Sequence, residues 1–302
     1  MIRYLYLGRV AYDEALRLQE ELVALRLDGR IDNILLLLEH PPVLTLGRNA
    51  NRANILASDA LLASRGVTLH EINRGGDVTF HGPGQLIGYP IFDLRSLTNS
   101  NGNRPGPVDF VRRMEEMLIR LCGAYGVPAG RIPGLTGVWC GLSSPESLSK
   151  ISPPAGPERK IGAIGIHVAR GVTSHGFAFN VTTDLDFFRL INPCGITDRP
   201  VTSLEREVAN SPELPDLESI AHQAARQFGQ VFDEQVLAIE SLADVHAQAA
   251  RASVPPKAEL TPSQTTSPEA PSTQRVDAQD TPLQIPREVE RLHNPSERPI
   301  RT

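Results

Sequence analysis

The sequence predicts an α+β fold in which helices flank a mixed β-sheet. Strand-like runs and a hairpin pattern dominate the middle of the chain, and amphipathic helical patterns bracket it. A doubly wound fold would instead alternate strands and helices along its length. With 302 residues, 40% of them hydrophobic, the chain is long enough to bury a sizeable core.

The first expected elements are a helix and three strands. Asp13–Leu27 has apolar residues at helical spacing, at Ala15, Leu18, Leu22 and Leu25. NILLLLEH (33–40) is a continuous apolar run of strand length before two prolines, and VLTLGR (43–48) follows as a second strand. VTFHGPGQLIGYPIFDL (78–94) is interpreted as a third strand around a glycine-rich bend.

The later elements begin with a helix over Pro107–Tyr125, with proline in its first turn and Val111, Met114, Leu118 and Leu121 on one face. TGVWCGL (136–142) predicts another strand. The stretch 160–181 predicts a hairpin that turns at 169–172, where Gly171 supplies the unusual dihedral angle. A last helix is indicated by Ile220, Ala224, Phe228 and Val231.

Composition changes near Gln248. From there Pro, Ser, Thr, Gln and Glu dominate, so we expect a folded domain over 1–247 and a disordered tail over 248–302. A docking role for the tail, through IPREVERLHNP (285–295), is the alternative interpretation. The polar insert over 143–159 is typical of a mobile loop.

Charge and apolar run length exclude some classes of function. A net charge of −5 and the lack of a lysine or arginine run argue against nucleic-acid binding. No apolar run approaches the roughly 20 residues that span a bilayer, and the start of the chain lacks a signal-peptide core. We therefore expect a cytoplasmic protein that does not bind membranes. Three cysteines without metal-type spacing argue against a disulfide framework.

The segment RGGDVTFHGPGQLIGYP (74–90) combines five glycines with a few polar side chains. Glycine lets backbone N–H groups approach a ligand, Arg74 offers a charged donor and His81 a titratable group. A tight structural turn is the alternative. It is not a phosphate-binding loop, because no Lys-Ser/Thr pair follows it.

This segment resembles the signature of the lipoyl(octanoyl) transferases, as do EHPPVLTLGR, GLTGVW, KIGAIGI, HGFAFN and NPCGI. The resemblance covers about residues 1–232. It implies a fold similar to the biotin and lipoate ligases. It also implies transfer of an octanoyl or lipoyl group from acyl carrier protein to a lysine of lipoyl domains, those of 2-oxoacid dehydrogenase complexes and the glycine cleavage H protein, without a cofactor.

A thiolate could carry the acyl group as a thioester, which divides one transfer into two easier steps. Cys194 lies in INPCGITDRP, where Pro193 and Gly195 favour an exposed turn. Cys122 falls on the apolar side of a helix and is expected in the core. Cys140 lies on a strand that could direct it into the core or into a cleft, and we favour the core.

Lys160 is the candidate partner of Cys194, because it occupies the position of the family's lysine, directly before IGAIGI. An ammonium group near a thiol lowers the pKa of the thiol, and the neutral amine can later accept a proton. A charged residue at a loop edge, beside Glu158 and Arg159, is the alternative interpretation.

The resemblance also implies an acyl and carrier-arm cleft whose walls come from three segments. They are Arg74, Gly75, Gly76, Asp77, Val78, Thr79, Phe80 and His81; Ala163, Ile164 and Gly165; and Gly176, Phe177 and Ala178. We expect no metal, because the spacing of His81, His167 and His175 fits no standard ligand pattern.

Two other functions stay open. A ligase of the same fold would activate free lipoate with ATP, and would need a nucleotide site but no cysteine. A binding module without catalytic activity would need neither Cys194 nor Lys160.

Overall fold

The computed structural model describes residues 1–98, 102, 104–142, 157–195, 198–208 and 213–252. The expected mobile insert, apart from 157–159, and the expected tail, apart from 248–252, lie outside these residues.

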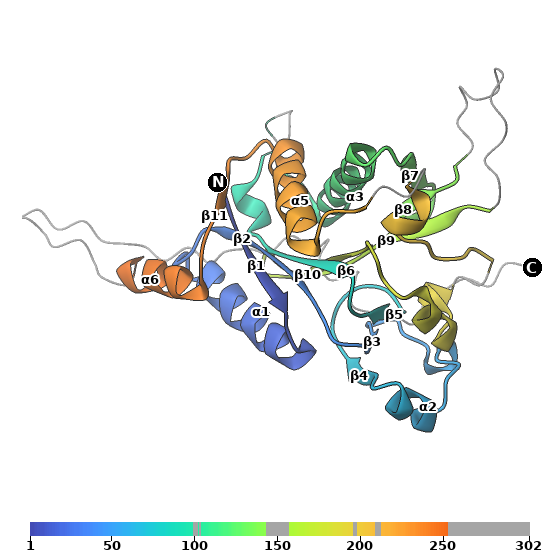
Figure 1. Ribbon diagram of the computed structural model, residues 1–302. Helices are drawn as coiled ribbons and strands as arrows, with labels where there is room; N and C mark the ends of the chain where they lie inside the picture. The colour runs from blue at the N-terminus through green and yellow to red at the C-terminus, as the bar shows by residue number, and fades with distance from the viewer. Residues whose placement is uncertain (99–101, 103, 143–156, 196–197, 209–212, 253–302) are drawn as a thin grey trace, which may run out of the picture. The chain divides into compact units, whose positions relative to one another are not determined.

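The centre of the domain is an eight-stranded mixed sheet (Figure 1). The first three strands of the sheet are parallel and every later neighbour is antiparallel. The predicted mixed sheet is therefore confirmed. In spatial order the strands are β11 (Val236–Ala238), β1 (Ile2–Arg9), β2 (Asn33–Glu39), β6 (Gln85–Ile91), β10 (Val172–Asn180), β9 (Arg159–Ala169), β8 (Leu135–Cys140) and β7 (Ala129–Ile132).

Helices cover both faces of this sheet, which explains the continuous apolar run of β2. Helices α3 (Pro107–Ala124) and α5 (Leu217–Phe232) cover one face, and α1 (Tyr12–Leu27) covers the other (Figure 1). Alternate residues of β2 then enter different cores: Leu35 and Leu37 pack with α3 and α5, whereas Leu36 and its alternate neighbours pack with α1.

The interpretation of 78–94 as one bent strand was wrong. The structure divides it into β5 (Val78–His81) and β6, which belong to different sheets. β5 pairs with β3 (Val43–Leu46), and β3 pairs in parallel with β4 (Thr68–Glu71). The backbone reverses at Gly84, whose φ is +75° and whose N–H donates to Glu39.

The hairpin between β9 and β10 turns at Arg170 and Gly171, which both have positive φ, so the predicted turn is confirmed. The helix expected to be the last is α5, but it is followed by α6 (Leu242–Ala252). Val245 and Ala249 of α6 are buried against the core on the α1 side.

Shorter elements complete the described part. They are α2 (Asp59–Ser64), α4 (Leu204–Glu207) and the 3₁₀ turns η1 (Arg52–Asn54), η2 (Leu94–Ser96), η4 (Leu185–Leu190) and η5 (Pro193–Gly195).

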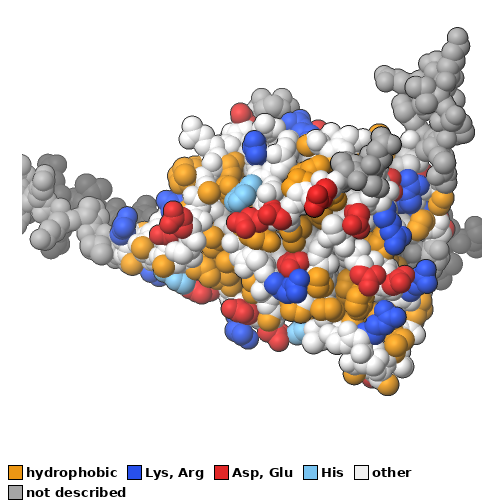
Figure 2. All heavy atoms as spheres, in the orientation of Figure 1, with side chains coloured by type: hydrophobic (Ala, Val, Ile, Leu, Met, Phe, Trp, Pro, Cys, Tyr) orange, Lys and Arg blue, Asp and Glu red, His pale blue; other side chains and the backbone are white. Residues whose placement is uncertain are grey.

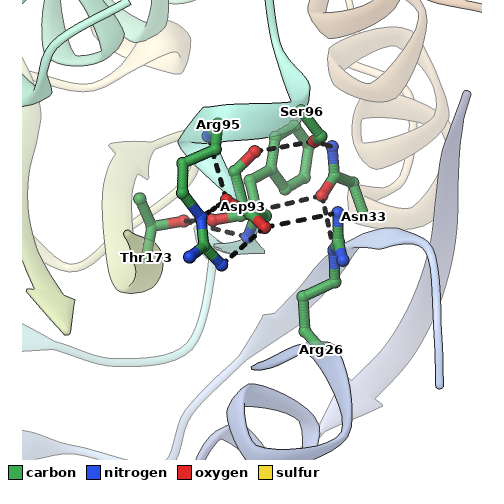
Figure 3. A network of polar contacts seen from close by, with 7 residues as sticks. Arg26, Asn33, Asp93, Arg95, Ser96 and Thr173 are labelled. Atoms are coloured by element: carbon green, nitrogen blue, oxygen red, sulfur yellow. Dashed lines mark hydrogen bonds and ion pairs between the residues drawn. The ribbon is translucent and has the colours of Figure 1, made fainter. Parts of the chain in front are cut away.

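A polar network fastens the chain just after β6 (Figure 3). Asn33 accepts the N–H of Asp93 at 3.0 Å and the guanidinium N–H of Arg26 at 2.9 Å. Arg95 donates to the Asp93 carboxylate through two nitrogens, and the pKa of that carboxyl is lowered mainly by these hydrogen bonds. Thr173 of β10 donates its hydroxyl hydrogen to the carbonyl of Pro90. α1, β2, β6 and β10 are thus joined at one end of the sheet.

The face shown in Figure 2 has acidic and basic side chains interspersed with hydrophobic ones. Among the described helices, none is both long enough and apolar enough to cross a membrane.

Candidate active site

Three hollows meet at the middle of β9, and all three are bordered by Ala163. The outer cavity is bordered by the start of α3, the turn between β7 and β8, and β9. The inner pocket lies between β9, β10, β6 and the segment 74–81. The side pocket lies between β9, β10, η4 and η5.

The outer cavity has a volume of about 570 Å³, within the range of small-molecule sites. Pro107, Val108 and Val111 form its apolar side on α3, and Lys160 lies at its edge. It shares Gly75, Gly76, Ala163, Ile164 and Gly165 with the inner pocket, which is much smaller at about 50 Å³. The two cavities are therefore adjacent, with these five residues between them.

Lys160 is fixed at the start of β9 and is only 8% exposed. Its backbone N–H donates to Pro200 and its carbonyl accepts from Thr202, both at 2.9 Å. On the other side Lys160 pairs with Trp139 of β8. Because β8 holds it on one side and the 200–202 segment on the other, the backbone of Lys160 has little freedom to move.

Cys194 is the middle residue of η5. The preceding residue, Pro193, lines the side pocket, and Lys160 lines the same pocket. Gly195 follows with a φ of +67°, and its N–H donates to the carbonyl of Asn192 at 3.0 Å. The structure therefore brings the turn that carries Cys194 to the pocket that Lys160 borders.

The other two cysteines are buried in the core, as predicted. Burial raises the pKa of the Cys140 thiol to about 12, and it raises that of Cys122 even further. Both thiols thus remain protonated near neutral pH, so neither provides a thiolate.

Arg74 is buried and directed toward β3. It donates to the carbonyl of Thr45 at 2.7 Å and to its hydroxyl at 2.9 Å. The next residue, Gly75, donates its N–H to Ile166 of β9 at 2.9 Å. A Cβ on Gly165 would lie 2.7 Å from the Gly75 carbonyl, so this close approach requires glycine in β9.

Most residues predicted to form the walls do line the inner pocket. They are Arg74, Gly75, Gly76, Thr79, His81, Ala163, Ile164, Gly165, Gly176, Phe177 and Ala178. Val78 and Phe80 do not, because the strand period of β5 places them in a core cluster where Phe80 stacks on Phe187. Asp77 is also outside all three linings, and its carboxylate instead accepts the N–H groups of Asn51 and Val78.

The inner pocket has four further lining residues that the sequence analysis did not propose for the wall: Tyr12, Ile87, Tyr89 and His175. Tyr89 and His175 lie in the quoted motifs, so a motif signal existed for them. Tyr12 had no such signal, because only the packing of α1 against the sheet brings its ring to the pocket.

The histidines around the inner pocket are neutral. Burial lowers the pKa of His81 to about 3 and the pKa values of His40 and His175 to about 4. His81 contacts the side-chain oxygen of Gln85 at 2.8 Å, and His40 contacts the Tyr89 hydroxyl at 2.7 Å. His81, which the sequence analysis named as a titratable group, is thus held mainly in its neutral form by burial.

Comparison with known proteins identifies the family. The lipoyl protein ligase A/B catalytic domain matches residues 11–228. The octanoyltransferase of Acidobacterium capsulatum is 57% identical over 248 residues, which cover 81% of this chain and 96% of that protein. The octanoyltransferase of Koribacter versatilis is 54% identical over 245 residues, with 81% and 90% covered. The chain belongs to the octanoyltransferase family.

Its fold is shared with solved lipoate ligases. A bi-partite lipoate protein ligase from Thermoplasma acidophilum covers 82% of this chain and 90% of its own, with a TM-score of 0.56 and 16% identity. A lipoate-protein ligase A bound with ATP covers 83% and 94%, with a TM-score of 0.55 and 14% identity. The predicted α+β fold of the lipoate ligases is confirmed, and the chain is an acyltransferase of protein lipoylation.

Proposed function

We propose that the chain transfers an octanoyl group from acyl carrier protein to a lysine of a lipoyl domain, through a thioester on Cys194 assisted by Lys160. The observation that carries the proposal is the side pocket, which is bordered both by Lys160 and by Pro193, the neighbour of Cys194. The lipoyl domains of 2-oxoacid dehydrogenase complexes and the glycine cleavage H protein are the acceptors that we propose.

In the first step the Cys194 thiolate attacks the carbonyl carbon of the donor thioester. The bond from that carbon to the carrier sulfur breaks, and the carrier thiolate takes the proton of the Lys160 ammonium. The products are octanoyl-Cys194, the carrier thiol and a neutral Lys160 amine.

In the second step the acceptor amine attacks the carbonyl carbon of octanoyl-Cys194. The nitrogen gives its proton to the Lys160 amine, and the carbon–sulfur bond of Cys194 breaks. The amide is released, while Lys160 is again an ammonium and Cys194 again a thiolate. One proton thus moves back and forth on Lys160 during each turnover.

The residue type at 160 supports this cycle. The chain has 30 lysines and arginines, and only Lys150, Lys160 and Lys257 are lysines. An arginine at 160 would supply the charge but could not give up its proton. A lysine can do both.

The hollows suggest where each part of the donor binds. We propose that the outer cavity takes the carrier arm and that the inner pocket takes the end of the octanoyl chain. Ile87, Phe177 and Ala178 give the inner pocket apolar walls. Each methylene buried there contributes about 0.8 kcal/mol.

Lysine variants test the dyad. Lys160→Met should raise the thiol pKa of Cys194 and slow its alkylation at neutral pH, because the ammonium is lost. Lys160→Arg should keep the thiolate and form the acyl-enzyme, yet pass octanoate poorly to a lipoyl domain. Transfer is measured without ATP by the mass of the lipoyl domain. A thiol titration identical in wild type and Lys160→Met would remove Lys160 from the dyad, and transfer that requires ATP would indicate a ligase.

A further inference from the structure

We infer that Trp139 is a positioning residue for the acyl transfer, and that its indole face holds the ammonium group of Lys160. This inference rests on the proposed role of Lys160. The Nζ atom of Lys160 lies 4.6 Å from the centre of the Trp139 ring. That separation is within the roughly 6 Å over which a cation is attracted to an aromatic face.

The strand register explains why these side chains meet. Trp139 of β8 is the direct partner of Lys160 on β9, so their side chains leave the sheet on the same side. The flanking residues Val138, Cys140 and Ile161 are buried in the core with α3. Trp139 belongs to none of the hydrophobic clusters of the described part, although it is fully buried.

Gly137 provides space for the lysine stem. Its φ is +123°, and a Cβ built there would lie 2.6 Å from the Gly162 carbonyl and 3.4 Å from Cε of Lys160. The register between β8 and β9 shifts between Val138 and Trp139, one residue beyond this glycine. The irregular backbone therefore lets the lysine stem pass beside β8.

A buried carboxylate anchors this part of β8. Glu115 of α3 is fully buried and accepts the N–H of Gly137 at 3.0 Å. The same carboxylate accepts from Arg112 at 2.6 Å and from Arg131 at 3.0 Å. Glu115 is thus paired with both arginines, and its hydrogen bond from Gly137 fixes this part of β8 to α3.

The ring of Trp139 should favour one protonation state of Lys160. An aromatic face attracts the ammonium form and gains little from the neutral amine, so it favours the charged form of Lys160 and restricts where the charge can lie. A fixed ammonium stabilises a nearby thiolate better than one that moves freely. Trp139 therefore supports the first half-reaction, in which Cys194 must be ionised.

The chain contains a single tryptophan, so its fluorescence reports on Trp139 alone. In Cys194→Ser protein, which lacks the active thiol, the emission should change at alkaline pH as Lys160 loses its proton. The same titration of Cys194→Ser/Lys160→Met should lack that transition. Identical titrations of the two proteins would show that the amine does not ionise against the ring.

Alkylation of Cys194 by a neutral reagent measures the consequence. Trp139→Leu should slow alkylation at neutral pH by about 3- to 30-fold, and Trp139→Phe, which keeps an aromatic face, by less. Phe110→Leu is the matched control, because Phe110 is equally buried but packs with Phe92 and Phe232 in the α3 and α5 core. Its alkylation rate should equal that of wild type.

A double-mutant comparison separates positioning from general loosening of the fold. In the Lys160→Met background, Trp139→Phe should leave the thiol titration unchanged, because the group on which the ring acts is gone. An equal effect with and without Lys160 would overturn the inference. If Lys160→Met itself leaves the titration unchanged, the dyad fails instead, so the two failures are distinguishable.

Discussion

The side-chain amide of Asn54 donates a hydrogen bond to the carboxylate of Asp77. The carbonyl of Asn54 in turn accepts the N–H of Asn192 at 2.7 Å, two residues before Cys194. Asp77 was expected in the wall of the cleft. Its contacts instead connect the glycine-rich segment to η1 and, through η1, to the turn that carries Cys194.

We therefore predict that Asp77→Ala slows the acylation of Cys194 by about ten- to a hundred-fold, because small displacements of a reacting group have effects of this size. The loss of hydrogen bonds to a charged group should also reduce the free energy of unfolding by about 1–3 kcal/mol. Single-turnover acylation and denaturant unfolding measure the two effects. Asp186→Ala, at an exposed carboxylate, is the control. Unchanged acylation in Asp77→Ala would show that the turn holds its position without this anchor.

The size of the inner pocket should set the preferred chain length. Ala178 is buried and lines the pocket on β10, so Ala178→Val adds two methyl groups to a small space. We expect the preference for octanoyl over hexanoyl donors to fall by about four-fold for each methylene excluded. Competition between the two donors measures the ratio. Ala221→Val, on the buried face of α5, controls for overpacking. A constant ratio would place the chain end elsewhere.

Helix α6 changes the expected effect of truncation. Gln248 donates to Asp32 at 2.9 Å, Arg30 donates to the Ala249 carbonyl at 3.1 Å, and Ala249 is buried. A chain ending at 247 should therefore melt about 3–8 °C lower than the full chain, whereas a chain ending at 252 should keep its Tm and activity. Equal Tm values for the two truncations would mean that the end of α6 adds no stability.

The neutral histidines predict how stability depends on pH. In the unfolded chain they bind protons below about pH 6.5, but in the folded chain His40, His81 and His175 do so only near pH 4 or below. The unfolded state thus takes up more protons between these values. Stability is full above pH 6.5 and falls with decreasing pH, by up to about 1.4 kcal/mol per pH unit for each histidine.

His175→Asn tests this, because asparagine tolerates the positive φ of 55° found there. The variant should lose less stability than wild type between pH 6.5 and 4.5 in urea unfolding. His246→Asn, at an exposed histidine of α6, should follow the wild-type curve. Parallel curves for wild type and His175→Asn would show that this imidazole does not contribute.

Local patterns were sufficient for most of the fold. β2 was predictable because an uninterrupted apolar run is what burial on both faces requires, and the hairpin was predictable from Gly171. The division between β5 and β6 was not, since glycines at 82 and 84 are equally compatible with a bend in one strand. α6 was missed because its residues are largely polar or alanine, and only Val245 and Ala249 are buried.

The site was predictable to the extent that its residues lie in continuous motifs. The segments 163–165 and 176–178 are neighbours on paired strands, so all six residues line the inner pocket. The alternation of side chains along β5 then keeps Val78 and Phe80 out of the inner pocket, which a motif alone does not reveal. Tyr12 and the Glu115–Gly137 contact depend on helix packing between distant parts of the chain, which no local pattern encodes.

Intact mass spectrometry after mixing with octanoyl-acyl carrier protein, in the absence of ATP and of an acceptor, tests the central claim most directly. We expect the protein to gain the mass of one octanoyl group, on the peptide that contains Cys194, and to lose it when a lipoyl domain is added. Cys194→Ser should gain no mass, whereas Cys122→Ser should behave as wild type. An adduct on another residue, or octanoylation of the lipoyl domain by Cys194→Ser, would contradict transfer through Cys194.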